Sequence, residues 1–400
     1  MSPIYLDNNA TTRTDPAVVA AMSPFFTEHF GNASSTHSFG SEVSGAVKRA
    51  RQSLQALLGA AFDHELIFTS GGTESNSSAI LSGLAAQPGC DEIITSTVEH
   101  PAILSLVGHI AKSNGVKVHY IAVDGRGALD VEAYRAALGP RTAMVSFMWA
   151  NNETGVLFPV AELAEMAHEH GALFHTDAVQ AAGKIKIDLK AANIDMLSLS
   201  GHKLHGPKGI GALYVRKGVK FHPLLRGGQQ ERGRRGGTEN APGIVGLGKA
   251  AELASEDLEG AVSKLRSLRD RLEQGLLASI DHCRISGGEA DRLPNTCNIA
   301  FEHIDGEAIL ANLNREGVAA SSGSACTSGS TEPSHVLRAM GVPASALHGV
   351  VRFSLSRETT VEEVDRVLGL LPAIIQKLRA MSPLWRDRQP NAELTASNTA

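Results

Sequence analysis

The chain has 400 residues, of which 42% are hydrophobic and 20% are charged, a composition typical of a folded globular protein. Its formal net charge is -5, so it lacks the basic excess of most nucleic-acid-binding proteins. No run approaches the roughly 20 apolar residues of a membrane span, and the N-terminus lacks the basic and apolar regions of a signal peptide. We therefore expect a cytoplasmic protein with neither a membrane nor a nucleic acid as its partner.

The cysteines are few, widely separated and without a C-x-x-C pair: Cys90, Cys283, Cys297 and Cys326. In a long chain without a signal sequence, this spacing predicts free thiols in a reducing compartment. It also argues against a structural zinc or iron–sulfur site bound by this chain alone.

Short apolar runs alternate with helix-like stretches between about residues 65 and 216. Seven of these runs are typical of buried strands, over residues 65–69, 92–97, 116–123, 142–149, 172–176, 196–199 and 210–215. Near-continuous apolar strands joined by helices predict a mostly parallel sheet that is covered by helices on both faces.

The pattern changes near residue 250. Residues 253–280 are predicted to form a charged, leucine-spaced helical region with one break, and strands are expected over 295–301 and 350–356. Thr360 and Glu363 form a capping box that begins the last helix. We expect a smaller α+β domain here, followed by a polar, disordered tail.

A glycine-rich segment, residues 70–76, follows one predicted strand and begins a helix. Gly72 lets the backbone approach an anion, and the helix N-terminus offers unpaired N–H groups. Thr73 is expected to cap the helix and to bind phosphate oxygens. An ordinary capped turn is the alternative, and this segment alone does not decide between the two.

Asp177 ends one predicted strand, and Lys203 follows a later one. Open α/β sheets bind ligands at the carboxyl ends of their strands. A carboxylate at such a place suits a pyridinium nitrogen, and a lysine amine forms an imine with a pyridoxal cofactor. A lone lysine is more often solvated, but small, apolar and glycine-rich neighbours favour a buried amine at Lys203.

Three further features suggest chemistry. A lone histidine in a loop is more often structural, but His100 follows the strand next to the glycine-rich segment, a position that makes a catalytic role more plausible. Cys326 lies in a Gly- and Ser-rich segment, 320–329, that is expected to present a thiol, whereas the other cysteines match buried, inert thiols. The Arg- and Gly-rich segment 226–238 lacks aromatic residues, which favours a phosphate- or subunit-contacting loop over an RNA-binding one.

Together these segments resemble the pyridoxal-phosphate-dependent cysteine desulfurases of the NifS/IscS type, within the class-V aminotransferases. The resemblance runs from residues 5–12 to residues 351–357, nearly the whole chain. Segment 321–329 resembles the longer cysteine loop of the first of the family's two groups. Segments 148–155 and 202–205 resemble the nitrogenase-associated NifS members more than the housekeeping ones.

The resemblance implies an α/β, aspartate-aminotransferase-like architecture, known as PLP fold type I. A large domain over 15–255 would hold a mostly parallel, seven-stranded sheet. A small α+β domain over 1–14 and 256–382 would carry the cysteine loop, and 383–400 would be a disordered tail.

The resemblance also implies a role for each matching residue. Lys203 would form an imine with pyridoxal 5'-phosphate, Asp177 would pair with the ring nitrogen, and Gln180 would bind the ring hydroxyl. His100 would stack on the ring and pass protons. The other implied cofactor contacts are Gly72, Thr73, Asn152, Ser200, His202 and, from a partner subunit, Thr238. Asn152 and Arg352 would hold the substrate carboxylate.

The implied reaction removes sulfur from L-cysteine, with Lys203 taking the α-proton, and gives L-alanine and a persulfide on Cys326. An iron–sulfur scaffold protein would receive the sulfur for nitrogenase maturation, and Cys326 would also be placed to ligate a transferred iron–sulfur cluster. The implied assembly is a homodimer. A selenocysteine lyase, or another fold type I lyase or aminotransferase, remains an alternative because it would share Lys203 and Asp177.

Overall fold

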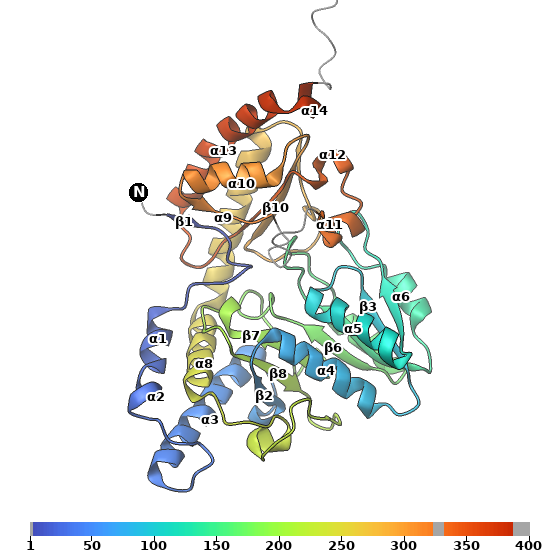
Figure 1. Cartoon of the computed structure of the whole chain (residues 1–400), viewed down its shortest axis with the longest axis vertical. Coiled ribbons are helices and arrows are strands. Elements are labelled where there is room, and N and C mark those ends of the chain that lie inside the picture. The colour runs from blue at the N-terminus through green and yellow to red at the C-terminus, as the bar shows by residue number, and fades with distance from the viewer. Residues whose placement is uncertain (1–2, 323–331, 387–400) are drawn as a thin grey trace, which may run out of the picture.

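The computed structural model describes residues 3–322 and 332–386. Figure 1 shows a large part with a sheet between helices and, above it in this view, a smaller part built around the long helices α9 and α13. Within the described residues, no helix combines the length and the apolarity needed to cross a membrane.

The large part contains a seven-stranded sheet with the strand order β2-β8-β7-β6-β5-β3-β4. All neighbouring strands are parallel except those that pair with β8. The strands are β2 (Leu66–Thr69), β3 (Glu92–Ser96), β4 (Lys117–Ile121), β5 (Thr142–Met148), β6 (Leu173–Asp177), β7 (Met196–Ser200) and β8 (Gly211–Val215). The predicted mostly parallel sheet is therefore confirmed, and all seven predicted strands are present.

Both faces of this sheet are buried, which explains the near-continuous apolar runs. Neighbouring strand residues alternate between two cores: Ile93 packs in one and Ile94 in the other, because successive side chains point to opposite faces. Helices α4 (Gly72–Ala86) and α5 (Pro101–Asn114) contribute to the Ile93 core. The Ile94 core draws on α3 (Ser38–Leu58), α7 (Val160–Glu169) and α8 (Ala241–Glu256).

The smaller part has an antiparallel sheet of order β12-β10-β9, made of β9 (Cys283–Ile285), β10 (Thr296–Phe301) and β12 (Val350–Ser354). Its core joins the N-terminal Ile4 and Leu6 to apolar residues between Leu265 and Ile375. The helices that pack there are α9 (Leu258–Ser279), α10 (Gly306–Arg315) and α13 (Val361–Met381).

The predicted helix break and the predicted capping box are both present in this part, although the helical region begins at Ala241 and not at residue 253 as expected. Asp257 separates α8 from α9, and its side chain accepts a hydrogen bond from the backbone N–H of Gly260, so the helical region has its single break there. Thr360 and Glu363 form the reciprocal capping box at the start of α13.

Two expectations differ from the structure. Gly71 is the N-cap of α4, without a side-chain cap, so the prediction that Thr73 caps this helix was wrong; the turn is made by a glycine with a φ of 154°, a conformation that side chains disfavour. Pro383–Arg386 form helix α14, at the position where we expected the disordered tail to begin.

The remaining elements are short. They are β1 (Ile4–Tyr5), β11 (Val318–Ala319), α1 (Pro16–Met22), α2 (Pro24–Thr27), α6 (Val131–Ala137), α11 (His335–Ala339) and α12 (Ala344–Leu347), with 3-10 turns η1 (Asp63–Glu65), η2 (Gly201–Lys203) and η3 (Gln230–Gly233). Strand β1 pairs with β11 in parallel, which brings the N-terminal segment beside the smaller part and places residues 7–12 between the two parts (Figure 1).

Candidate active site

A cavity of about 500 Å³ lies at the carboxyl ends of β5, β6 and β7, the edge where parallel sheets bind ligands. It is lined by ten of the predicted site residues: Gly72, Thr73, His100, Asn152, Asp177, Gln180, Ser200, His202, Lys203 and Arg352. Thr238 is exposed in the segment before α8 and does not line this cavity. Cys326 lies outside the described residues.

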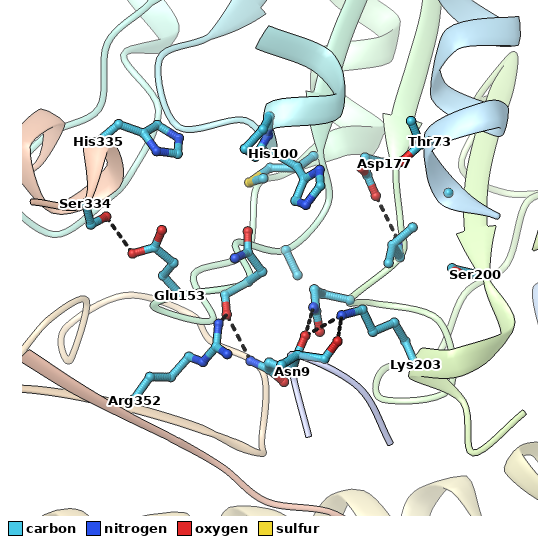
Figure 2. A pocket seen from close by; sticks show the side chains of 18 of the residues that line it. Asn9, Thr73, His100, Glu153, Asp177, Ser200, Lys203, Ser334, His335 and Arg352 are labelled. Atoms are coloured by element: carbon cyan, nitrogen blue, oxygen red, sulfur yellow. Dashed lines mark hydrogen bonds between the residues drawn. The ribbon is translucent and has the colours of Figure 1, made fainter. Parts of the chain in front are cut away.

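One end of the cavity is shaped for a phosphate. Thr73 and Ser200 lie on the same side, away from Arg352 (Figure 2). A Cβ atom at Gly72 would lie only 2.9 Å from Cγ2 of Val179, so the backbone at the start of α4 is accessible only with glycine there. The N–H groups of this 15-residue helix carry partial positive charge that favours an anion.

His202 lies at the same end, in η2, with Nδ1 3.1 Å from the hydroxyl oxygen of Thr11. Burial lowers the pKa of His202 to about 4, assisted by the positive charges of Lys203 and Lys208. The ring is therefore neutral at physiological pH, and it can present one N–H to an anion.

Asp177, the last residue of β6, is held by two donors. Asn76 Nδ2 donates to Asp177 Oδ2 at 2.6 Å, and the backbone N–H of Val179 donates to Oδ1 at 3.0 Å. The side chains of Asn76 and Asp177 are both buried. Their contact fixes the carboxylate in place and orients it at the cavity wall (Figure 2).

Lys203 extends into the cavity from η2, directly after β7. Its Nζ donates to the carbonyl oxygens of Asn9 and Ala10, at 2.5 and 2.6 Å. The N-terminal segment is held against this turn because the backbone N–H and the hydroxyl of Thr12 both bond to the carbonyl oxygen of His202. The Lys203 amine, from the turn after β7, and the Asp177 carboxylate, at the end of β6, thus face one cavity (Figure 2).

His100 is the N-cap of α5, and its Nδ1 accepts the backbone N–H of Ala102 at 3.1 Å. A backbone N–H can only donate, so Nδ1 is unprotonated and a neutral ring carries its proton on Nε2. Directly before it, Glu99 is fully buried, and burial raises the pKa of Glu99 to about 8. A neutral, buried carboxyl group therefore belongs to the residue directly before the catalytic candidate in the chain.

The opposite end of the cavity carries Arg352, whose side chain is buried on β12. Its guanidinium donates to Asp7 Oδ1 at 2.8 Å and to the carbonyl oxygen of Asn152 at 2.9 Å. Nearby, the hydroxyl of Ser334 donates to Glu153 at 2.6 Å, and burial raises the pKa of Glu153. This end presents a planar cation suited to a carboxylate.

These features fit pyridoxal phosphate. The cavity offers a lysine amine, a buried carboxylate for a pyridine nitrogen, and a glycine-shaped helix N-terminus for a phosphate. Oδ1 of the buried Asn76 also has no hydrogen-bond partner among the described residues. Within those residues, no cluster of three metal-binding side chains occurs.

Several residues of the site were not predicted from the sequence: Asn9, Asn76, Glu99, Glu153, Lys184, Ser334 and His335. Asn76 follows Thr73 at helical spacing, a signal that could have placed it on the same helix face. Asn9 had no comparable signal, because its contact with Lys203 spans 194 positions of the chain.

Comparison with known proteins agrees with this geometry. Residues 4–367 match the family model for class-V aminotransferases. A cysteine desulfurase of Gluconacetobacter diazotrophicus is 66% identical, over 96% of each chain. The cysteine desulfurase NifS of Azotobacter vinelandii is 60% identical, over 98% of this chain and 97% of the relative.

A solved structure of a NifS-like protein is 37% identical and superimposes with a TM-score of 0.88, covering 94% of this chain and all of the other. Fold and sequence therefore agree with the resemblance described above. The chain belongs to the class-V aminotransferase family, whose members depend on pyridoxal phosphate, and within that family to the cysteine desulfurases.

Proposed function

We propose that the protein removes sulfur from L-cysteine and releases L-alanine. The observation that carries this proposal is the placement of Lys203, Asp177 and Arg352 around one cavity. Lys203 and Asp177 suit a pyridoxal cofactor, and Arg352 at the far end suits the carboxylate of an amino acid.

Pyridoxal phosphate, when bound here, supplies a reactive carbonyl carbon and an electron-withdrawing ring. Lys203 Nζ would bind that carbon and, once the substrate amine has replaced it there, would take the α-proton of the substrate. Asp177 would hold a proton on the ring nitrogen, and Gln180 would bond to the ring hydroxyl. His100, with its proton on Nε2, would stack on the ring and pass protons. Thr73, Ser200 and His202 would bind the phosphate.

Cys326 is the proposed sulfur acceptor. Its thiolate would attack the substrate sulfur, so that the carbon–sulfur bond breaks, a persulfide forms on Cys326 and alanine leaves. Residues on either side of segment 323–331 support this proposal. Ser321 pairs with the backbone of Arg352, and Ser334 binds Glu153 at the cavity wall.

Product analysis tests this function. The wild type should be yellow and should form alanine and sulfide from cysteine, with Cys326 trapped as a persulfide. Lys203→Ala should lose the absorbance band of the bound cofactor. Full sulfide release by Cys326→Ala would contradict the mechanism and favour the alternative, a selenocysteine lyase or another lyase or aminotransferase of this fold.

We also propose that the protein is a cytoplasmic homodimer with two domains, over residues 15–255 and over 1–14 with 256–382. Two observations support these proposals. The three cysteines of the described residues are all free thiols, as expected in a reducing compartment. The exposed Leu224 and Leu225 lie beside the segment that carries Thr238, which would reach the partner's phosphate.

We propose that an iron–sulfur scaffold protein that serves nitrogenase receives the persulfide sulfur from Cys326. The likeness of segments 148–155 and 202–205 to nitrogenase-associated members supports this, as does a relative named NifS at 60% identity. Transfer of labelled sulfur from Cys326 to a scaffold protein tests it, and the genes neighbouring this one would distinguish nitrogenase from general cluster assembly.

A further inference from the structure

Lys184 is a buried lysine next to the site, and the reaction described above does not use it. It is 8% exposed, whereas Lys186, two residues along, is exposed. Burying an amine is unfavourable unless its N–H groups are bonded. Burial, together with the positive charges of Lys203 and Arg352, lowers the pKa of Lys184 to about 7.

Both hydrogen bonds of Lys184 go to a single residue. Nζ donates to the side-chain oxygen of Gln180 at 2.9 Å and to its backbone carbonyl at 3.2 Å. A neutral amine has two N–H groups, and a charged one has three. Either protonation state can therefore make both bonds.

These contacts determine how the Gln180 amide is oriented. In its charged form Lys184 can only donate, so the amide oxygen faces it. At the other end, the amide nitrogen donates to the carbonyl oxygen of Asn9 at 2.9 Å, and a carbonyl can only accept. The two contacts independently give the same orientation.

Gln180 and Lys203 share a hydrogen-bond acceptor. The Asn9 carbonyl that accepts from Gln180 also accepts from Lys203 Nζ at 2.5 Å. The chain around Lys184 is packed tightly against the turn of Lys203, since a Cβ atom at Gly183 would lie 2.4 Å from Cδ2 of Leu204. Lys184 is thereby held in a fixed place relative to the cavity.

We propose that Lys184 is a positioning residue: it fixes the side-chain amide of Gln180, so that the amide N–H groups and not the oxygen face Lys203 and the ring hydroxyl of the cofactor. A second N–H of that amide is then available to donate to the ring oxygen. This inference rests on the proposed function, because it assigns a partner to Gln180 in the same site.

Lys184→Met tests the inference, since methionine keeps the length of the side chain and removes its donors. Lys186→Met makes the same chemical change on the surface and is the matched control. We measure the affinity of the apoprotein for pyridoxal phosphate and the pH midpoint of the absorbance band of the bound cofactor. Lys184→Met should bind pyridoxal phosphate about tenfold more weakly than the wild type, because about one hydrogen bond is lost.

The pH midpoint should rise by about one unit in Lys184→Met, because the ring oxygen loses a donor that stabilises its ionised form. Lys186→Met should match the wild type. Lys184→Arg keeps donor groups at this position, so its pH midpoint should stay close to that of the wild type. If Lys184→Met does not fold, Lys184→Leu, which also lacks donors, is measured in its place with the same expectation.

A double-mutant cycle shows whether Lys184 acts through Gln180. In a Gln180→Leu background, Lys184→Met should change neither the affinity nor the midpoint further. A full effect in that background, or equal behaviour of the 184 and 186 variants, would overturn the inference. A wild-type chain that does not bind pyridoxal phosphate would instead overturn the proposed function.

Discussion

Asn76 on helix α4 donates a 2.6 Å hydrogen bond to Asp177 at the end of strand β6, although 101 positions separate them in the chain. The contact exists because α4 begins at the carboxyl edge of the sheet, where β6 also ends. The helix that offers its N-terminus to a phosphate therefore also holds the carboxylate proposed for the ring nitrogen. A single element thus sets both ends of the cofactor site.

Asn76→Asp should lower turnover at least tenfold above neutral pH. The variant places a second carboxylate against Asp177 in a buried site, where two like charges cannot both be ionised. Part of the activity should return as the pH falls and one carboxyl group takes a proton. Steady-state rates between about pH 5 and pH 8, the range in which proteins are usually most stable, give the measurement.

Asn114→Asp is the control for this prediction, because it makes the same change at an exposed position at the end of α5. It should behave like the wild type. A turnover for Asn76→Asp that equals that of the control at every pH would show that Asp177 does not depend on its amide partner.

Arg352→Lys should raise the KM for L-cysteine by about 100-fold with a smaller change in kcat, since the planar fork that binds a carboxylate is replaced by a point charge. Its pair with Asp7 should persist in part, so the fold should be kept. Arg271→Lys changes an exposed ion pair with Asp365 and should leave both constants unchanged. A KM that stays at the wild-type value would exclude Arg352 as the carboxylate-binding residue.

Glu99 should make the protein less stable as the pH rises. Its pKa is raised from 4.5 to about 8 in the folded chain, so the folded state binds more protons than the unfolded state between these values. The contribution of protonated Glu99 to the free energy of unfolding is therefore complete below pH 4.5. Between pH 4.5 and about pH 8 the free energy of unfolding decreases by about 1.4 kcal/mol per pH unit.

Glu99→Gln removes this loss, because an amide keeps the neutral form at every pH. Thermal unfolding should show a smaller decrease in Tm toward higher pH for Glu99→Gln than for the wild type. Glu169→Gln, at an exposed position at the end of α7, should follow the wild type. Parallel curves for all three proteins would mean that Glu99 is ionised in the folded state.

The sheet could be predicted from the sequence because burial on both faces leaves a clear apolar pattern. The strand ending at Asp177 and the strand before Lys203 are both buried over their inner positions, and the polar residues at their carboxyl ends mark the ligand-binding edge. The capping box of Thr360 likewise depends on neighbours in sequence, so it needed no tertiary information.

The contacts within the site could not be predicted in the same way. Lys203 binds the carbonyl of Asn9, and Ser334 binds Glu153, across 194 and 181 positions. Periodicity shows which face of an element is buried, but not which distant backbone group lies opposite. Lys184 carried no signal at all, since its burial depends on the turn at Gly183 and on Leu204 beside it.

A final prediction concerns Thr238, which is exposed and absent from the lining of its own chain's cavity. If it binds the phosphate of a partner subunit, each site of a homodimer combines Lys203 of one chain with Thr238 of the other. Thr238→Ala alone should turn over substrate at least tenfold more slowly than the wild type, because a hydrogen bond to a charged group is lost. Lys203→Ala alone should be inactive. Co-refolding equal amounts of the two variants produces heterodimers with one intact site. The mixture should then regain about a quarter of wild-type activity if subunits pair at random, whereas activity no higher than the average of the two separate variants would show that Thr238 acts within its own chain or not at all.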